Sequence, residues 1–567
     1  MTRCRNVLVK KLSMDNKRLF LLISLGFVLL LIWQAWQRDY GQPPQATQPA
    51  STASQAPAPS ATPGAPDVPN AAKPATAPTT AIAPDGAPNT AQPILEQGQT
   101  IGVVTDVIKA EISTVGGDLR KLDLLAYPAA ANKPNVPFRL FNDNLPNLFV
   151  AQSGLLAGAH GPDHHAVFSA EQTAYRMADN ANELKVPLRW TSPDGVTITK
   201  TYTFQRHSYE IKIDYQVSNT TAQEWRGRMY GQLQRNDDKA NQSFFIYTYT
   251  GGVLNSPENR YEKITFDNMA DQDLSRDVKD GWAAMLQHYF VGAWVPARDQ
   301  INHYYSKVLD GARYVLGVIT PEQVIAAGQT GTLSMRLYVG PKLQDHLQEV
   351  APGLELTVDY GLLTVLAQPI FWLLKYIHGV VNNWGWAIVL LTLLIKLVFY
   401  KLSAASYKSM ANMRRLQPRI AALRERYADD RQKMSQGMME LYKTEKINPL
   451  GGCLPVLVQI PVFIALYWVL LESVELRQAS FILWLQDLSA PDPYYILPLL
   501  MGITMFIQQK LSPAPPDPLQ AKVMMVLPVV FTLFFAFFPA GLVLYWVVNN
   551  TLSIAQQWYI TKSVASS

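Results

Sequence analysis

The chain has 567 residues and a formal net charge of only +5, and 48% of its residues are hydrophobic. Its two cysteines, Cys4 and Cys453, exclude a disulfide framework, and we expect both to be free thiols without a metal site. The sequence contains no GxxxxGKS/T phosphate loop, HExxH zinc helix or GxSxG nucleophile elbow, so it lacks the motifs of common ATPases and hydrolases.

The first apolar segment, residues 19–36, predicts a transmembrane anchor helix. It follows Lys10, Lys11, Lys17 and Arg18, and these basic residues place residues 1–18 in the cytoplasm under the positive-inside rule. A cleaved signal peptide is the alternative, but its apolar core would be shorter, and "IWQAWQRD" is a poor cleavage site. Met14 begins a compact basic segment, "MDNKRLF", so we expect it to be the native start.

Residues 37–93 predict an extended, disordered linker in the periplasm. The stretch from Gly41 to Pro93 contains 13 of the 39 prolines and almost no large apolar side chains. Such a segment cannot bury enough apolar surface to fold.

Residues 94–345 predict a periplasmic all-β domain. In "YEIKIDYQV", residues 209–217, apolar and polar side chains alternate strictly, as in a strand with one buried face. Turn sequences such as "SPDG" separate such strands, and we expect a large antiparallel sandwich with its own core. The cluster "AHGPDHH" contains His160, His164 and His165, but no Cys or acidic ligand set accompanies it, so a solvated loop is favoured over a metal site.

The segment 359–383 is apolar but is interrupted by Pro369 and carries Lys375 and His378. We expect it to be an amphipathic helix that lies on the outer membrane interface and does not span the bilayer. Five further spans are predicted at residues 385–400, 450–471, 494–511, 521–538 and 541–560.

The charges of the connecting segments orient these spans. Residues 401–448 carry eleven Lys and Arg against five Asp and Glu, whereas residues 472–493 carry only Arg477 as a basic residue. The positive-inside rule therefore predicts a polytopic α-helical membrane protein with six transmembrane helices, both termini inside and the β domain outside. Residues 384–561 would form a five-helix core, and residues 562–567 a short cytoplasmic tail.

Residues 403–447 predict a cytoplasmic helical hairpin. Apolar residues recur at spacings of three and four on both arms, namely Met410, Met413, Leu416, Ile420, Leu423 and Tyr427, then Met434, Met438 and Leu441. One interpretation is a self-packed antiparallel pair. The other is that the methionines contact passing apolar segments, because Met adapts to varied partners. The basic exterior could bind ribosomal RNA or anionic lipid headgroups.

Lys396 lies inside the second predicted span, and no Asp or Glu of the spans obviously pairs with it. One interpretation is that its stem snorkels to the cytoplasmic headgroups, since it lies roughly 6–8 Å inside Lys401. The other is that it is the one charge of a wet cavity, lined by polar groups from three spans such as Thr392, Gln459, Asn549 and Ser553. The residues alone leave both open.

Four long segments resemble the YidC-type membrane protein insertases of Gram-negative bacteria. They are "NWGWAIVLLTLLIKLVFYKLSAASYKSMANMRRLQPRI", "EKINPLGGCLPVLVQIPVFIALYWVL", "SVELRQASFILWLQDLSAPDPYYILPLLMG" and "FPAGLVLYWVVNN". The resemblance covers essentially the whole chain, including the anchor, the linker and the β domain.

The resemblance implies a five-helix core around a hydrophilic groove that is open to the cytoplasm and the lipid and closed outside. Lys396 would be its positive charge, Thr392 and Gln459 other groove positions, and Tyr545 and Trp546 an aromatic pair facing substrates. The β domain would be a supersandwich related to sugar-mutarotase folds. Implied partners are nascent membrane proteins, the Sec translocon, the ribosome and membrane lipids, with no cofactor, small-molecule substrate or ATP.

Two alternatives belong to other functional classes. A transporter or channel that uses Lys396 as an anion site would predict internal symmetry between the halves of the chain, and none is visible. A membrane-anchored periplasmic carbohydrate-active enzyme would predict paired carboxylates in the β domain and would not need five further spans. We therefore expect an insertase and chaperone of the bacterial inner membrane, not an enzyme.

Overall fold

The computed structural model describes Pro69 and residues 95–237, 248–427, 430–445, 454–512 and 518–565. The expected N-terminus, the anchor helix and, apart from Pro69, the linker lie outside the described residues. The chain divides into two compact units. The β domain and most helices belong to one unit, whereas the segment Asn412–Pro449 belongs to the other.

The strands of the β domain follow the periodicity of the sequence. In β10 (Glu210–Ser218), every second side chain is fully buried, namely Ile211, Ile213, Tyr215 and Val217. β10 pairs antiparallel with β9 (Thr197–Gln205) on one side and β20 (Thr330–Pro341) on the other. The alternation predicted for residues 209–217 is therefore confirmed.

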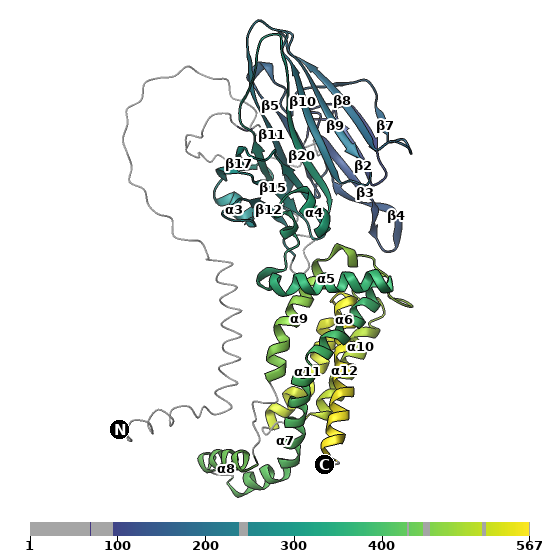
Figure 1. Ribbon diagram of the computed structural model, residues 1–567, viewed down its shortest axis with the longest axis vertical. Coiled ribbons are helices and arrows are strands. Elements are labelled where there is room, and N and C mark those ends of the chain that lie inside the picture. The colour runs from purple at the N-terminus through teal and green to yellow at the C-terminus, as the bar shows by residue number, and fades with distance from the viewer. Residues whose placement is uncertain are drawn as a thin grey trace, which may run out of the picture. The chain divides into compact units, whose positions relative to one another are not determined.

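Two sheets enclose the core of this domain (Figure 1). The 11-stranded sheet follows the order β14 (Ser275–Lys279), β17 (Ile301–Leu309), β18 (Arg313–Ile319), β11 (Trp225–Asn236), β5 (Phe149–Leu156), β3 (Leu119–Ala130), β2 (Ile108–Ser113), β1 (Thr100–Val104), β7 (Ala174–Arg176), with β19 (Gln323–Ile325) on β11 and β4 (Lys133–Phe141) on β3. The 9-stranded sheet follows the order β13 (Glu262–Ile264), β12 (Gly251–Asn255), β15 (Trp282–Leu286), β16 (Phe290–Val295), β20, β10, β9, β8 (Glu183–Thr191), β6 (Ser169–Ala170). Among the described strands, β1 and β7 alone pair parallel, which departs from the expected antiparallel sandwich.

Lys200 occupies an inward position of β9, between apolar neighbours. Its ammonium donates to the carbonyls of Gly116, at 3.0 Å, and Ser153, at 3.3 Å. It also lies over the rings of Tyr202 and Tyr215. Burial lowers the pKa of Lys200 to about 7. The carbonyls and ring faces replace water around this cation. A lysine can therefore occupy a buried position in the alternating pattern of β9.

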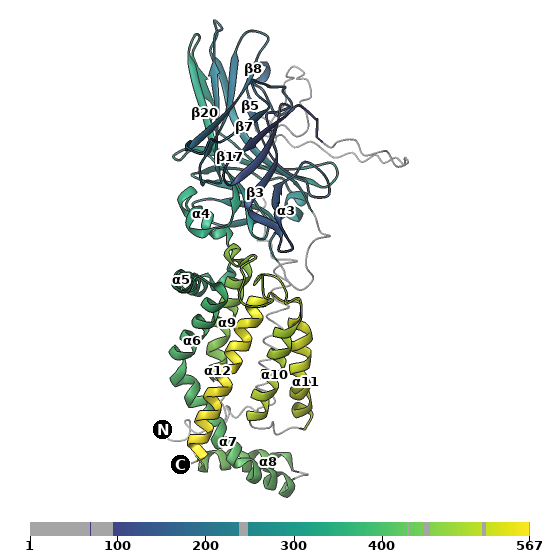
Figure 2. The same cartoon turned by 90° about the vertical axis from the view of Figure 1, so that its right-hand side faces the viewer.

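Short helices of the β domain lead into the helical region. They are η2 (Gly158–His160), α3 (Phe266–Asp271), α4 (Gln344–Val350), η4 (Leu354–Thr357) and η5 (Gly361–Leu363). The helices that follow are α5 (Thr364–Val381), α6 (Trp384–Val398), α7 (Tyr400–Arg426), α8 (Arg431–Thr444), α9 (Leu454–Glu472), η7 (Val474–Leu476), α10 (Ile496–Leu511), α11 (Pro518–Phe535) and α12 (Ala540–Ala565). Helix α12 packs against α6, α9 and α10, and α10 also packs against α11, beside which it runs in Figure 2.

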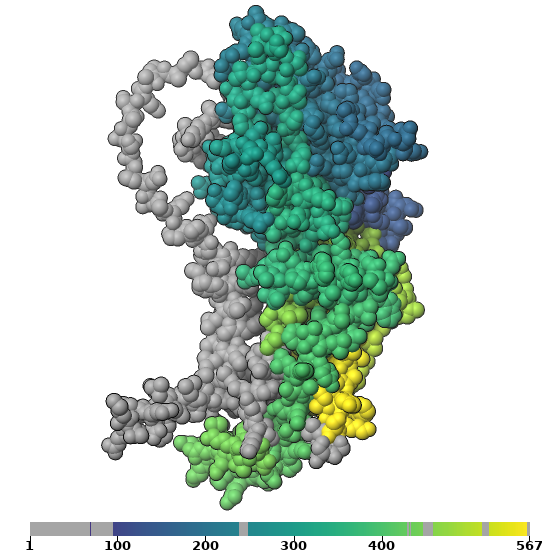
Figure 3. Space-filling model, viewed as in Figure 1, coloured from purple at the N-terminus to yellow at the C-terminus, as the bar shows by residue number. Residues whose placement is uncertain are grey.

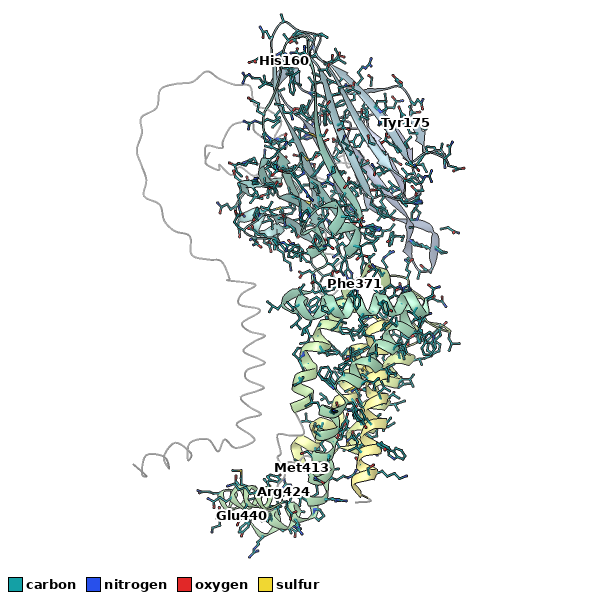
Figure 4. The ribbon with its side chains drawn as sticks, in the orientation of Figure 1. His160, Tyr175, Phe371, Met413, Arg424 and Glu440 are labelled. Carbon is teal, nitrogen blue, oxygen red and sulfur yellow. The ribbon has the colours of Figure 1, made fainter. Side chains whose placement is uncertain are left out.

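Helix α5 contacts α6 and α9 and runs across their ends (Figures 1 and 3). Its buried face consists of Ala367, Phe371, Leu374 and Ile377, of which Phe371 is labelled in Figure 4. The opposite face exposes Val365, Trp372, Tyr376 and Val380. Pro369 lies inside α5 and does not end it. An apolar, aromatic exposed face is typical of a helix at a membrane interface.

Length and composition identify few spanning helices within the described residues. Gly361–Val381 is long and apolar enough to cross a bilayer, and α6 with α7, which are bent by 68° relative to each other, would make a second span. The first is the segment that we expected on the interface. The apolar helices Val458–Glu472, Ile496–Leu511 and Ala521–Phe535 are shorter. The six-span topology therefore stays a prediction.

The segment that we expected to be a cytoplasmic hairpin contains two helices, α7 and α8. Helix α7 continues through Pro418, and α8 begins after Asp430, whose carboxylate accepts hydrogen bonds from the backbone N–H groups of Gln432 and Lys433. The two arms meet where Gly437 faces Leu423, because a Cβ on Gly437 would approach that side chain to 3.0 Å. Figure 4 labels Met413, Arg424 and Glu440 on these arms.

The β domain joins the end of α9 through a buried ion pair. The Lys342 ammonium, just after β20, lies 3.2 Å from the Glu472 carboxylate, and both side chains are almost fully buried. Burial raises the pKa of Glu472, and Lys342 partly offsets this rise. Beside them, His288 donates from Nε2 to the Leu471 carbonyl at 2.9 Å, and burial lowers the pKa of this imidazole to about 3. The imidazole is therefore neutral at ordinary pH.

Arg477 makes a second connection between these parts. Its guanidinium donates to the carbonyls of Pro128, at 2.7 Å, and Ala129, at 3.2 Å. It also lies over the rings of Phe138 and Phe290. The one basic residue of the segment 472–493 is thus held by carbonyls and ring faces of the β domain.

Candidate functional site

Helices α6 and α7 form an elbow near Lys396. Helix α6 begins at Trp384, after the N-cap residue Asn383, whose side chain accepts from the N–H of Trp386, and ends at Val398. The N–H of Phe399 donates to the Ile395 carbonyl, and α7 resumes at Tyr400 in a new direction. The elbow follows the last turn of α6, which contains Lys396.

The Lys396 ammonium is buried and points to α12. Only 8% of the residue is exposed, and Nζ donates to the Ser553 hydroxyl at 2.7 Å. Ser553 in turn donates to the Asn549 carbonyl, also at 2.7 Å, and the side chain of Tyr407 from α7 interacts with Ser553. We refer to Lys396, Tyr407, Asn549 and Ser553 as the polar cluster. Within the described parts of the chain, no carboxylate forms an ion pair with Lys396.

Two other predicted residues lie near this cluster without bonding to Lys396. Thr392 is buried one turn earlier on α6, and its hydroxyl donates to the Ile388 carbonyl of the same helix. Gln459 of α9 donates to the Ser403 hydroxyl of α7 at 3.5 Å, which is a long contact. The polar groups thus come from α6, α7, α9 and α12.

The predicted aromatic pair packs against α9 and α11. The ring of Tyr545 stacks on Phe463 with centroids 5.9 Å apart, and Trp546 meets Phe463 edge-on at 5.0 Å. Trp546 also contacts Phe535. Its buried indole N–H has no hydrogen-bond partner among the described residues. A buried donor without a partner is costly, so this end of the site suits water or a polar ligand atom.

The structure brings some predicted residues together and leaves others apart. Lys396 and Asn549 share the polar cluster, and Tyr545 and Trp546 share the contact with Phe463. Three hairpin methionines, Met413, Met434 and Met438, belong to the second unit, whereas Met410 belongs to the first. All four are half-buried.

The sequence prediction placed Ser553 among the polar groups of the cavity but did not pair it with Lys396, and it omitted Tyr407. Ser553 follows Asn549 by four residues, so helical spacing alone could have placed its hydroxyl on the same face of the last span. Tyr407 follows Lys396 by eleven residues on another helix, and only the elbow at Phe399 brings its side chain to Ser553. No sequence pattern indicated that elbow.

The loop of residues 477–495 packs against the N-terminal ends of α6 and α12. The N–H groups of Ala540 and Gly541, at the start of α12, donate to the carbonyls of Ala490 and Leu488 in this loop. The ring of Phe481 packs directly against Gly385 at the start of α6. Because this contact leaves no space for a Cβ, Gly385 allows the loop to close on α6.

Substitution of Gly385 should open this loop. In Gly385→Ala, the new methyl group would overlap the Phe481 ring, so Phe481 must move, at a cost of about 1–3 kcal/mol. In a background without native cysteines, a cysteine at position 392 should become reactive to a membrane-impermeant maleimide added outside. Gly379→Ala on α5 is the matched control, since a Cβ there meets nothing within 4 Å. Equal labelling of both variants would contradict a closing role for the loop.

Comparisons with known proteins identify the family. Two family models match the chain, "YidC periplasmic domain" over residues 100–373 and "60Kd inner membrane protein" over residues 376–567. The chain is 53% identical over 561 residues to the "Membrane protein insertase YidC" of Nitrosococcus oceani, covering 97% of this chain and 99% of that protein. The chain belongs to the YidC family of membrane protein insertases. It is thus an inner-membrane protein with a periplasmic domain, and it is an insertase rather than an enzyme.

Other YidC proteins extend the similarity over the same length. The "Membrane protein insertase YidC" of Methylococcus capsulatus is 51% identical over 554 residues, covering 97% of this chain and 99% of that protein. A solved structure described as "Active YidC insertase crystal structure with the first transmembrane domain resolved" is 17% identical, with a TM-score of 0.38, and covers 82% of this chain and 94% of that chain. The expected YidC resemblance is confirmed by the sequence relatives, and membrane insertion implies nascent membrane proteins as substrates.

Proposed function

We propose that this insertase acts through a hydrophilic groove lined by α6, α9 and α12, with Lys396 as its positive charge. The observation that carries the proposal is the direction of the Lys396 side chain, which bonds to Ser553 of α12 instead of extending into the exposed surroundings. Thr392, Gln459, Tyr545, Trp546 and Asn549 would be the other groove residues. The ammonium would attract the carboxylates of a substrate tail that must cross the membrane.

The energy for insertion would come from the substrate itself. A wet groove shortens the hydrocarbon path that a polar tail must cross, and the apolar substrate segments then leave along α6 and α12 into lipid. Burial of apolar surface contributes about 25 cal/mol per Å², so a transmembrane segment supplies a large favourable term without ATP.

The proposed topology has six spans, with both termini in the cytoplasm and the β domain in the periplasm. The basic segment 401–448 and the presence of Arg477 as the one basic residue of the segment 472–493 support this orientation. In this arrangement α5 lies on the outer membrane interface. Its two faces support this position, because one is buried against the protein and the other exposes apolar and aromatic side chains.

Three partners belong to the proposal besides the substrates. The Sec translocon would deliver larger substrates, and small ones would insert through this protein alone. The ribosome and anionic lipid headgroups would meet the basic outer face of the hairpin, whose charges support such contacts.

Site-specific photo-crosslinking tests the groove. A photo-reactive residue at position 392 or 545, both buried on the proposed groove side, should crosslink to a ribosome-stalled membrane protein chain. The matched positions 529 and 533 on α11 are 61% and 66% exposed and should crosslink to lipid instead. Crosslinks to the stalled chain from the α11 positions, with none from positions 392 and 545, would contradict the proposal that the groove binds the substrate.

The hairpin should act through its methionines more than through its charges. Changing Met410, Met413, Met434 and Met438 together to Ser removes soft apolar surface, so crosslinking of the hairpin to apolar substrate segments should fall several-fold. The control changes the exposed Arg414 to Gln. If the Met changes leave crosslinking intact and loss of basic residues stops insertion, the hairpin is a docking site for the ribosome or lipid.

A further inference from the structure

The position of the Lys396 charge depends on what holds the end of its side chain. A lysine stem is long and flexible, and near a membrane surface it reaches for the headgroups when nothing retains it. Here a single hydrogen bond, 2.7 Å long, joins Nζ to the Ser553 hydroxyl on another helix. The two residues are 157 positions apart in the chain, so this bond connects α6 to α12.

The Ser553 hydroxyl is arranged to accept. A serine hydroxyl has one hydrogen to donate and two lone pairs to accept with. Its hydrogen goes to the Asn549 carbonyl at 2.7 Å, so the oxygen presents lone pairs to the ammonium. Ser553 is only 3% exposed, so water competes weakly for this position. Direction and burial therefore both favour a fixed Lys396–Ser553 bond.

The hydrogen-bonding groups around Ser553 are only partly paired with one another. An ammonium has three hydrogens, and Lys396 makes one hydrogen bond to the described residues. One turn along α12, Gln557 is 2% exposed, and its side-chain oxygen has no partner among the described residues. A buried unpaired acceptor is costly unless water or a donor reaches it. The face of α12 beside the ammonium is thus polar and incompletely satisfied.

We propose that Ser553 is the positioning residue for the Lys396 charge: it accepts one hydrogen bond and so keeps the ammonium in the groove, with its other N–H groups free for a substrate carboxylate. This inference rests on the proposed function of the groove. It makes Ser553 a determinant of specificity for acidic translocated tails, although Ser553 itself bears no charge.

The test compares insertion of two substrates that differ only in the tail, one acidic and one neutral. Ser553→Val and Ser553→Thr have nearly the same shape, and only Thr keeps the hydroxyl. Ser553→Val should insert the acidic tail roughly tenfold less efficiently, as expected for loss of a hydrogen bond to a charged group, and the neutral tail normally. Ser553→Thr should insert the acidic-tail substrate as efficiently as the native protein does.

Two further variants make the outcome decisive. Thr551→Ala on the exposed side of α12 removes a hydroxyl with the same backbone bond, from Thr551 to the Val547 carbonyl at 2.7 Å, and should change neither substrate. In a Lys396→Leu background, Ser553→Val should have no additional effect, because the charge that it positions is gone.

Each outcome has one meaning, once equal amounts of protein in the membrane are verified. If Ser553→Val lowers the insertion of both substrates equally, Ser553 has a structural role and the inference is overturned. The same holds if Ser553→Val lowers insertion further in the Lys396→Leu background. If Lys396→Leu lowers insertion of the acidic-tail substrate alone and Ser553→Val does not, the inference fails and the proposed function of the groove is retained. If Lys396→Leu itself does not discriminate, the proposed function fails.

Discussion

Lys396→Leu should insert substrates with acidic translocated tails poorly and substrates with neutral tails normally. Two unit charges about 4 Å apart attract by roughly 4 kcal/mol at an effective dielectric constant of 20 and by about 1 kcal/mol in water. The difference of about 3 kcal/mol corresponds to roughly a hundredfold effect on acidic tails. The measurement is insertion efficiency with matched tails at equal expression.

The same position offers two controls. Lys396→Arg keeps the charge and should retain function, whereas Lys396→Glu should repel acidic tails and fail more severely than Lys396→Leu. If Lys396 only snorkels, Lys396→Leu should be harmless or stabilising, because an isolated cation in hydrocarbon is costly. Equal insertion of acidic tails by Lys396→Leu and the native protein would therefore favour snorkelling.

Lys342→Met should be strongly destabilising. The substitution leaves the Glu472 carboxylate buried without its partner, and breaking a buried pair in this way costs about 3–5 kcal/mol. The double change Lys342→Met with Glu472→Leu removes both charges and should recover most of the loss. Thermal unfolding of the detergent-solubilised protein, followed by tryptophan fluorescence, measures both effects. An additive loss in the double variant would contradict a paired role.

The defect of Lys342→Met should also depend on pH. Burial raises the pKa of Glu472 in the folded protein, and Lys342 opposes this rise, so the pKa should rise further in the variant. A carboxyl with a raised folded pKa binds more protons when folded, and stability then increases as the pH falls. The variant should therefore recover part of its stability in acid. Lys185→Met breaks the exposed pair with Glu183 and should leave unfolding unchanged at any pH.

The local architecture was predictable because it depends on short-range patterns. The alternation of residues 209–217 predicted β10, and the spacing of Met410, Met413 and Leu416 predicted one arm of the hairpin. Burial of every second side chain follows from the strand geometry itself. The pairing order of two large sheets was not predictable, since a strand such as β11 pairs with β5 and β18 across long separations.

Arg477 illustrates how a residue that is counted in a charge pattern can have a structural role that the pattern does not show. As the one basic residue of the segment 472–493, it served only to indicate that this segment lies outside. In the structure its guanidinium bonds to carbonyls of the β3 strand and lies over two phenylalanine rings. Charge counting cannot reveal such a contact because it ignores distance in space.

The sequence by itself determined the family, the order of the β domain and the helices, and the presence of a lysine in an apolar helix. These features are written in composition, periodicity and long local motifs, which need no knowledge of distant contacts. Only the tertiary structure decided what Lys396 touches. Its partner Ser553 lies 157 residues away, and the partner of Lys342 lies 130 residues away, so both bonds exist only once the helices and sheets are packed.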